Sequence, residues 1–262
     1  GGGNFGVVTS FEYRLHPVGP VLGGELIFPL SRAKETLRFY RDWSLAAPDE
    51  VRADATLLSG PDGPALAIIV CHCGSIEEGE RVLRPLQQFG PPAVDTIAPS
   101  PYARIQNLLT DILAPGLCHY WKSGVFRSFS DDAIETLVDF FAADIPSPFA
   151  AVAIEQLGGA IGRVGERDTA FSHRRAQYSC LVLRAWRDPA ASQANVAWGR
   201  SCYAAVDPFL EQGVYVNYLG DEGESRVRAA YGANYQRLAA LKQKYDPTNF
   251  FRGNQNIQPA ET

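Results

Sequence analysis

The chain has 262 residues, of which 46% are hydrophobic and 20% are charged, and this composition is typical of a globular protein with a sizeable core. The net charge is −5 at neutral pH without a long basic run, which argues against a nucleic-acid partner. No apolar run approaches the roughly 18 residues that span a bilayer, and no charged-then-apolar leader is visible, so we expect a soluble protein without a membrane partner. These features favour a small-molecule ligand, and they carry no signal for a compartment or an oligomeric state.

The first residues predict a glycine-rich turn that leads into a strand. Gly1-Gly-Gly-Asn-Phe-Gly6 precedes Val7, and apolar residues then alternate with polar ones as far as Leu15. Glycine lets a backbone approach a ligand closely, although a tight turn also needs glycine for steric reasons alone. Because the chain contains no methionine and opens within this glycine run, we expect it to be the C-terminal part of a longer protein.

The next stretch alternates strands and helices. Ser75 and Glu78 form a capping box, which predicts the start of a helix, and Gly60-Pro-Asp-Gly63 is a strong turn signal between two strands. The order of strand, helix, strand, strand and helix predicts an antiparallel sheet with helices on one face, an α+β arrangement. The expected strands cover residues 21–28, 51–58 and 65–73, and the expected helices cover 31–47 and 75–89.

The second half continues this pattern after a proline-rich, irregular stretch at residues 90–101. Ser130 and the two aspartates after it predict a helix start, where the macrodipole favours acidic residues. Pro247 ends the last helix. The expected strands cover residues 120–126, 150–157, 176–186 and 213–218, and the expected helices cover 102–113, 130–141, 190–210 and 224–245.

Five cysteines are an odd number for a complete set of disulfides. Cys71-His72-Cys73 and Cys118-His119 could be combined into a metal site on paper, but Cys-X-Cys lacks the usual zinc spacing. Alternation places Cys71 and Cys73 on one face of a strand. We therefore expect packed free thiols and no metal ion, an interpretation that stoichiometric co-purification of a metal would contradict.

Two positions combine polar groups with an apolar strand. Tyr215, Asn217 and Tyr218 fall within four residues, and strict alternation puts the first two on one face and Tyr218 on the other unless the strand bends. Such groups are expensive to bury unpaired, so the cluster either binds a polar aromatic cofactor or leaves its hydroxyls in water. Glu155 lies inside the strand expected at 150–157, and it is either on an exposed face or functional.

Three separated segments resemble motifs of the FAD-dependent oxidases of the berberine bridge enzyme family. They are the opening residues 1–9, the cluster Tyr215-Val-Asn-Tyr218 and the tail Asp246-Pro-Thr-Asn-Phe-Phe-Arg-Gly-Asn-Gln-Asn-Ile257. Residues 169–174 are similar to a further family segment, with Ser172 standing where proline is usual. The similarity covers essentially the whole chain, and the tail motif is specific.

The resemblance implies an α+β fold of the PCMH type, with a large antiparallel sheet of about seven strands flanked by helices. On this basis residues 1–18 are the last strand of an FAD-binding domain that is mostly absent, and residues 19–212 are the substrate-binding domain. Residues 213–262 are a berberine-bridge-type segment whose helix and tail return to the FAD site. Any residue that attaches the FAD covalently then lies upstream of this chain.

The resemblance also implies roles for single residues. Tyr218 matches the tyrosine that serves as the base in many members, and Glu155 is the second candidate because some members use a glutamate. A phenol is a poor base at neutral pH unless a neighbour lowers its pKa, and Lys122 and Arg174 are candidate neighbours. The tail asparagines could instead satisfy backbone groups of an irregular segment. The residues expected to contact FAD are Gly2, Gly3, Asn4, Phe5, Gly6, Val7, Val8, Tyr215, Asn217, Asn254 and Asn256.

The implied function of the intact protein is oxidation of an alcohol, a sugar or an amine by hydride transfer to FAD, with oxygen as the second partner and hydrogen peroxide as a product. The isolated chain is expected to be inactive. The alternative is a non-catalytic α+β binding module, or a family member that keeps the fold and has lost turnover.

Overall fold

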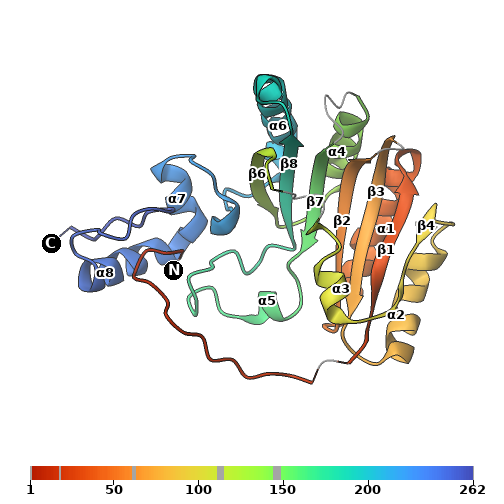
Figure 1. The fold of residues 1–262 in the computed structure, drawn as a ribbon, viewed down its shortest axis with the longest axis horizontal. Coiled ribbons are helices and arrows are strands. Elements are labelled where there is room, and N and C mark those ends of the chain that lie inside the picture. The colour runs from red at the N-terminus through yellow and green to blue at the C-terminus, as the bar shows by residue number, and fades with distance from the viewer. Residues whose placement is uncertain (1, 18, 61–62, 111–114, 144–148, 262) are drawn as a thin grey trace.

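The computed structural model describes residues 2–17, 19–60, 63–110, 115–143 and 149–261. Its centre is an eight-stranded sheet in which every pairing among these residues is antiparallel (Figure 1). The strand order is β4-β1-β3-β2-β7-β8-β6, and β5 also pairs with β1. The predicted α+β class is confirmed, with eight strands instead of about seven. The strands are β1 Val21–Pro29, β2 Val51–Gly60, β3 Gly63–His72, β4 Val94–Asp95, β5 Ala98–Ser100, β6 Cys118–Phe126, β7 Ala150–Gln156 and β8 Tyr178–Trp186.

Four helices cover one face of this sheet (Figure 1). They are α1 Ala33–Ala46, α2 Ile76–Gln88, α4 Asp131–Ala143 and α6 Ser192–Val206. The capping box predicted at the start of α2 is confirmed, because the Ser75 hydroxyl accepts a hydrogen bond from the Glu78 amide at 3.2 Å. The short helices α3 Tyr102–Gln106 and α5 Ala160–Arg163 lie elsewhere, and α7 Glu224–Tyr231 and α8 Tyr235–Tyr245 form the C-terminal part.

Alternation along the strands gives the sheet one apolar face and one mixed face. The residues that face the four helices are buried in a single core, as Leu57, Ile68 and Ile154 illustrate. Their neighbours point the other way, and many of them are half-buried or exposed, although Ala67 and Ser179 are buried. We call this second side the open face, and it carries Arg52, Asp54, Ile69, Glu155 and Leu181.

A second, smaller core belongs to the C-terminal part. It contains Val214, Leu219 and Ile257 together with apolar residues of α7 and α8, and Phe5 packs against it. The first and last segments of the chain therefore meet at the same place (Figure 1). This cluster brings together the three segments that resemble family motifs: the opening residues, the segment around 215–218 and the tail.

The strand predicted over residues 7–15 does not form. The structure assigns no regular structure to this stretch, and Val7 and Leu15 are 78% and 88% exposed. The alternation is real, but a strand also needs a partner for its backbone hydrogen bonds, and the described residues pair none with it. The segment runs as an exposed connection from the C-terminal part back to β1 (Figure 1).

Two further predictions are corrected in the C-terminal part. The strand expected at 213–218 is instead a 3₁₀ turn at Val216–Tyr218. The single helix expected at 224–245 is interrupted by a second 3₁₀ turn, Gly232–Asn234, where Gly232 has a φ of 51°.

Smaller differences concern loops and cysteines. The helix expected at 102–113 ends at Gln106, and its positions 111–113 lie outside the described residues, as do 61–62 of the predicted turn. Cys180 and Cys202 are packed as predicted, whereas Cys71 is half-buried and Cys73 is exposed. Among the described helices, none is both long and apolar enough to cross a bilayer.

Candidate functional site

The 3₁₀ turn at Val216–Tyr218 brings together two tyrosines that strand alternation would separate. Its backbone bonds run from the amides of Tyr218 and Leu219 to the carbonyls three residues earlier, at 2.9 and 3.2 Å. Residues three apart in such a turn are eclipsed, so Tyr215 and Tyr218 lie on one side. Their rings meet edge to face with centroids 5.4 Å apart. The 3₁₀ turn therefore places both tyrosines on one side, as a bend in the predicted strand would have done.

Tyr218 reaches from this turn to the open face of the sheet. Its hydroxyl donates a hydrogen bond to Oε1 of Glu155, on β7, at 2.7 Å. The two residues that the sequence singled out as alternative bases thus form one pair. The contact joins the C-terminal part to the sheet.

Burial favours the protonated form of both partners. It raises the pKa of the Glu155 carboxyl above its ordinary value, and the nearby Asp54 charge adds to this while the donated Tyr218 hydrogen bond opposes it. Burial also raises the pKa of the Tyr218 phenol well above its usual range, and the Glu155 carboxylate raises it further. A free phenolate is therefore disfavoured here, and the carboxylate is the proton acceptor of the pair.

Arg52 and Asp54 complete the polar group on the open face, and sequence reasoning missed both. Asp54 lies opposite Glu155 in the register of β2 and β7, and it accepts hydrogen bonds from Arg52 Nε at 2.8 Å and from the Gln156 amide at 2.9 Å. The positive charge of Arg52 lowers the pKa of both Glu155 and Tyr218. Alternation in the expected strand 51–58 puts these charges on one face, which is the signal that could have found them.

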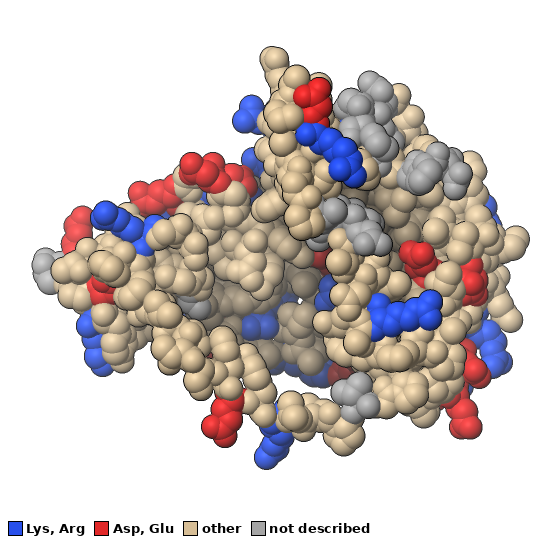
Figure 2. Space-filling view, in the orientation of Figure 1, with Lys and Arg blue, Asp and Glu red and all other residues tan. Residues whose placement is uncertain are grey.

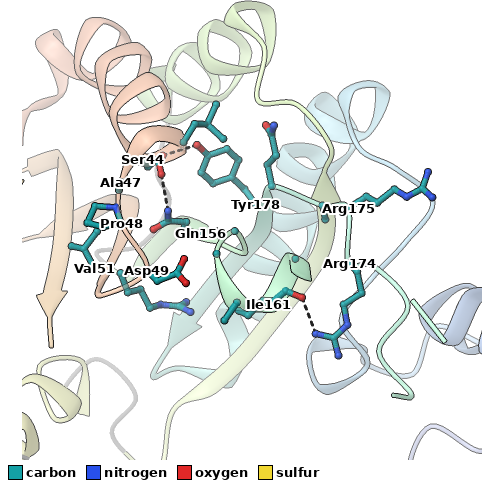
Figure 3. Close-up of a pocket in the computed structure, with 18 residues that line it drawn as sticks. Ser44, Ala47, Pro48, Asp49, Val51, Gln156, Ile161, Arg174, Arg175 and Tyr178 are labelled. Atoms are coloured by element: carbon teal, nitrogen blue, oxygen red, sulfur yellow. Dashed lines mark hydrogen bonds between the residues drawn. The ribbon is translucent and has the colours of Figure 1, made fainter. Parts of the chain in front are cut away.

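The two cations predicted to assist Tyr218 have other partners. Lys122 pairs with Glu222 at 3.0 Å and lies over the ring of Tyr203. Arg174 donates to the carbonyl of Ile161 at 3.1 Å (Figure 3) and also to the Thr169 hydroxyl. The cation whose charge lowers the pKa of Tyr218 is Arg52.

Tyr215 and Asn217 present polar groups beside this pair. Asn217 Nδ2 donates to the Tyr215 hydroxyl at 2.7 Å, and Phe171 packs edge to face on Tyr215 with centroids 5.8 Å apart. Tyr215 remains 36% exposed. An exposed aromatic ring held by a second ring and an amide is suited to lie against a planar ligand.

The opening residues and the tail are joined by hydrogen bonds. Asn4 is buried, its Nδ2 donates to the Gln255 carbonyl at 3.0 Å, and its Oδ1 accepts from the Ile257 amide at 2.8 Å. Asn254 donates to the Gly2 carbonyl at 3.3 Å. Gln255 in turn donates to the carbonyls of Leu219 and Gly220, directly after the tyrosine turn. The asparagine side chain at position 4 thus has a structural role, and its contact with FAD stays a prediction.

Several features of this region fit a bound FAD. Asn256 has a buried Oδ1 atom with no hydrogen-bond partner among the described residues, as expected of an acceptor that awaits a ligand donor. Gly2 and Gly3 have φ values of 58° and 75°, and a Cβ on Gly3 would collide with Asn254. Beyond these glycines, Phe5 packs on the C-terminal core and Gly6 has open space around it. Val7 and Val8 are exposed.

A hollow of about 360 Å³ lies at the edge of the sheet (Figure 3), and neither Tyr218 nor Glu155 lines it. The end of α1, the start of β2 and the connection from β7 to α5 form its walls, and Arg52 lines it. Figure 2 shows a broader depression of the surface between the C-terminal helices and the sheet, with Lys and Arg side chains visible inside. Tyr218 and Glu155 are themselves half-buried, so the pair is partly accessible to solvent.

Comparison with known proteins agrees with this geometry. The sequence model of the family described as "Berberine and berberine like" matches residues 214–258, the segment that contains the tyrosine turn and the tail. An FAD-linked oxidoreductase of Dictyostelium discoideum is 28% identical over 99% of this chain and 57% of its own length. The uncharacterized FAD-linked oxidoreductase YgaK of Bacillus subtilis is 29% identical over the same shares. The chain thus spans less than two thirds of the relatives that it matches.

Solved structures share the fold. That of 6-hydroxy-D-nicotine oxidase from Arthrobacter nicotinovorans superimposes with a TM-score of 0.83 at 24% identity, covering 98% of this chain and 59% of the other. The chain therefore has the same fold as the matching part of this oxidase. The chain is therefore similar to FAD-linked oxidoreductases over almost its whole length, and its segment 214–258 matches the berberine-like family model.

Proposed function

We propose that this chain forms the substrate side of an FAD-dependent oxidase that acts on an alcohol, a sugar or an amine. The observation that carries the proposal is the 2.7 Å hydrogen bond from Tyr218 to Glu155, which sets a proton donor and acceptor pair between the C-terminal part and the open face. A half-buried titratable pair with raised pKa values is the kind of arrangement that active sites use.

The pair moves one proton in two coupled transfers. The Tyr218 phenol takes the proton from the substrate hydroxyl or amine while it passes its own proton to Oε1 of Glu155. The raised pKa of Glu155 helps this step, because the carboxylate is a stronger base than an ordinary glutamate. Arg52 holds Asp54 in place and moderates the build-up of negative charge beside the pair.

FAD, when bound, supplies the redox chemistry by accepting the hydride from the substrate carbon, and reoxidation by oxygen gives hydrogen peroxide. The chain's own part is to hold the cofactor edge and to keep the substrate against it. The backbone at Gly2 and Gly3, the Asn256 side chain and the exposed ring of Tyr215 are the groups that we assign to holding FAD, and Asn217 orients Tyr215.

Tyr218→Phe tests this role in the FAD-loaded protein. The substitution removes the hydroxyl that contacts both the substrate and Glu155, and loss of a general acid–base group lowers rates by about 10²- to 10⁴-fold. We expect the rate of anaerobic flavin bleaching by a substrate to fall by this factor while the affinity for FAD stays within a few-fold. Glu155→Gln should give a loss of the same order.

The matched control is Tyr215→Phe, which removes a hydroxyl from the same turn without touching Glu155. It should weaken FAD binding more than it slows bleaching. An equal loss of FAD affinity and bleaching rate in Tyr218→Phe would make Tyr218 a cofactor contact only and would contradict the proposal. A protein that binds FAD tightly but is bleached by no alcohol, sugar or amine would support a non-catalytic family member.

A further inference from the structure

Two thiols meet at the end of β3, away from the Tyr218–Glu155 pair. The Sγ atoms of Cys71 and Cys73 lie 3.9 Å apart. Cys73 is exposed and Cys71 is half-buried. We propose that Cys71 and Cys73 form a reversible intrachain disulfide, so that this strand end is an oxidation site of the protein.

The backbone at this point allows the bond. Residues two apart in a strand have Cα atoms separated by about 6.6 Å, at the upper end of the range that disulfides span. β3 ends at His72, so Cys73 lies just beyond the sheet and is free of the strict strand spacing. Its amide is nevertheless bonded to the Glu50 carbonyl at 2.8 Å, which keeps the two thiols together. Closing the link requires the two Sγ atoms to move from 3.9 Å apart to the disulfide bond length of about 2.05 Å.

The neighbours leave room for the thiols to react. Cys71 lies on the open face between Gly23 of β1 and Arg52 of β2, where it stays half-buried. Cys180 and Cys202, by contrast, are buried in the core. Oxidation by a water-soluble agent is therefore directed to the Cys71–Cys73 pair.

A metal site is the competing use for two adjacent thiols, and the surroundings do not support it. The ring of His72 points to the opposite face, where it is buried and its Nδ1 accepts a hydrogen bond from the Gly74 amide at 3.2 Å. Within the described ranges, no three His, Cys, Asp or Glu residues are grouped to hold a metal ion. Two thiols without a third ligand favour a disulfide.

The oxidant is a peroxide, and the chemistry is balanced in two steps. The exposed Cys73 thiol attacks hydrogen peroxide, which gives a sulfenic acid and one water. The Cys71 thiol then attacks that sulfur, the S–S bond forms, and the second oxygen leaves as water. Burial and the neighbouring thiol raise the pKa of Cys71 to about 12, so the second step should accelerate as the pH rises. Hydrogen peroxide is also the product of the proposed oxidase, and only this source of oxidant rests on the proposed function.

Peptide mapping of the whole protein tests the disulfide without any turnover. Trypsin cuts after Arg52 and Arg81, so residues 53–81 form one peptide that contains Cys71 and Cys73 and no other cysteine. After treatment with hydrogen peroxide and a thiol-alkylating reagent under denaturing conditions, we expect this peptide to carry no alkyl group and to have lost the mass of two hydrogen atoms. Reduction with dithiothreitol should restore two alkylation sites.

The other cysteines serve as internal controls, because each lies in a separate tryptic peptide. Cys180 and Cys202 should remain alkylated as before, and Cys118→Ser should leave the Cys71–Cys73 link unchanged. In Cys71→Ser, peroxide should leave Cys73 as a sulfenic or sulfinic acid. Wild-type protein that gains only oxygen on Cys73, that links between two chains, or that keeps both thiols free under peroxide would overturn the proposal. Each of these outcomes is independent of whether the protein oxidises a substrate.

Discussion

The hydrogen bond between Tyr218 and Glu155 couples two groups whose pKa values are both raised by burial. Both have a raised pKa, yet each acts differently on its partner: the phenol donates and so lowers the pKa of the carboxyl, whereas the carboxylate raises the pKa of the phenol. When Glu155 is ionised, the phenolic proton of Tyr218 therefore lies in the hydrogen bond between the two oxygens. A proton taken up by the pair ends on Glu155, which explains why the strand glutamate and the turn tyrosine belong to one function.

The raised pKa of Glu155 predicts a pH dependence of stability. An acid whose pKa is higher in the folded state stabilises the fold below its unfolded value of about 4.3, and this contribution is lost as the pH rises through the folded pKa. Glu155→Gln removes it. We expect the free energy of unfolding of Glu155→Gln, relative to the wild type, to increase between pH 4 and neutrality, measured by urea denaturation at a series of pH values.

Tyr218→Phe provides the control for this measurement. It keeps the carboxyl but removes the donor that lowers its pKa, so the wild-type loss of stability should extend to higher pH. A pH profile of Glu155→Gln that runs parallel to the wild type would show that Glu155 titrates alike in the folded and unfolded chains.

Single residues of the site were predictable from the sequence, but their partners were not. Tyr218 and Glu155 stand out because each puts a polar group into an apolar segment. The pairing of Glu155 with Asp54 depends on the register of β2 against β7, which alternation within one strand does not reveal. For the same reason Lys122 and Arg174 were predicted to be near Tyr218, where the structure places Arg52.

At the scale of elements, the break between α7 and α8 shapes the C-terminal part. Gly232 has φ 51° and ψ −131°, a conformation that residues with a side chain rarely adopt. A Cβ at this position would also lie 2.7 Å from the Ser172 hydroxyl oxygen. The break lets α8 turn so that Leu238 and Ala239 join the core around Ile257.

Gly232→Ala should therefore destabilise the protein. The strained backbone costs about 1–3 kcal/mol, and the contact with Ser172 adds to this. The free energy of unfolding in urea measures the effect. Gly220→Ala is the matched control, because its Cβ would meet nothing within 4 Å. Equal stability of the two variants would mean that the α7–α8 break does not depend on glycine.

Helices and strands were predicted well where the local sequence determines them. They were predicted poorly where contacts with other segments of the chain determine them. The helices α2 and α4 follow from their caps at Ser75 and Ser130, which are local signals. Residues 7–15 alternate as a strand does, but without a ladder partner they remain extended and exposed. The turn at Val216–Tyr218 is apolar enough for a strand, and the contacts of its tyrosines with Glu155 and Phe171 favour the tighter conformation.

At the scale of the whole molecule, a buried ion pair joins the two ends of the chain. Lys242 of α8 is fully buried, and its Nζ donates to Asp246 Oδ2, to the Asn4 carbonyl and to the Phe251 carbonyl at 2.6, 2.6 and 2.7 Å. Asp246 also accepts the amides of Phe250 and Phe251. One ammonium group thus fixes the opening segment, the tail and the last helix. The assignment of residues 1–18 and 213–262 to the FAD side of the molecule stays a prediction, and this junction is its structural basis.

Lys242→Met should lower the free energy of unfolding more than a lysine-to-methionine substitution at an exposed ion pair. The methionine keeps much of the side-chain volume but leaves the Asp246 carboxylate and two carbonyls without their donor, and breaking a buried pair costs about 3–5 kcal/mol. Lys34→Met, which removes an exposed pair with Asp139, should cost about 0–1 kcal/mol. Hydrogen exchange adds a local readout: the Ile257 amide, which donates to Asn4 Oδ1, should exchange faster in Lys242→Met and unchanged in Lys34→Met. If Lys242→Met unfolds at the wild-type urea concentration with normal protection at Ile257, then the apolar core around Ile257 holds the two chain ends together without the ion pair.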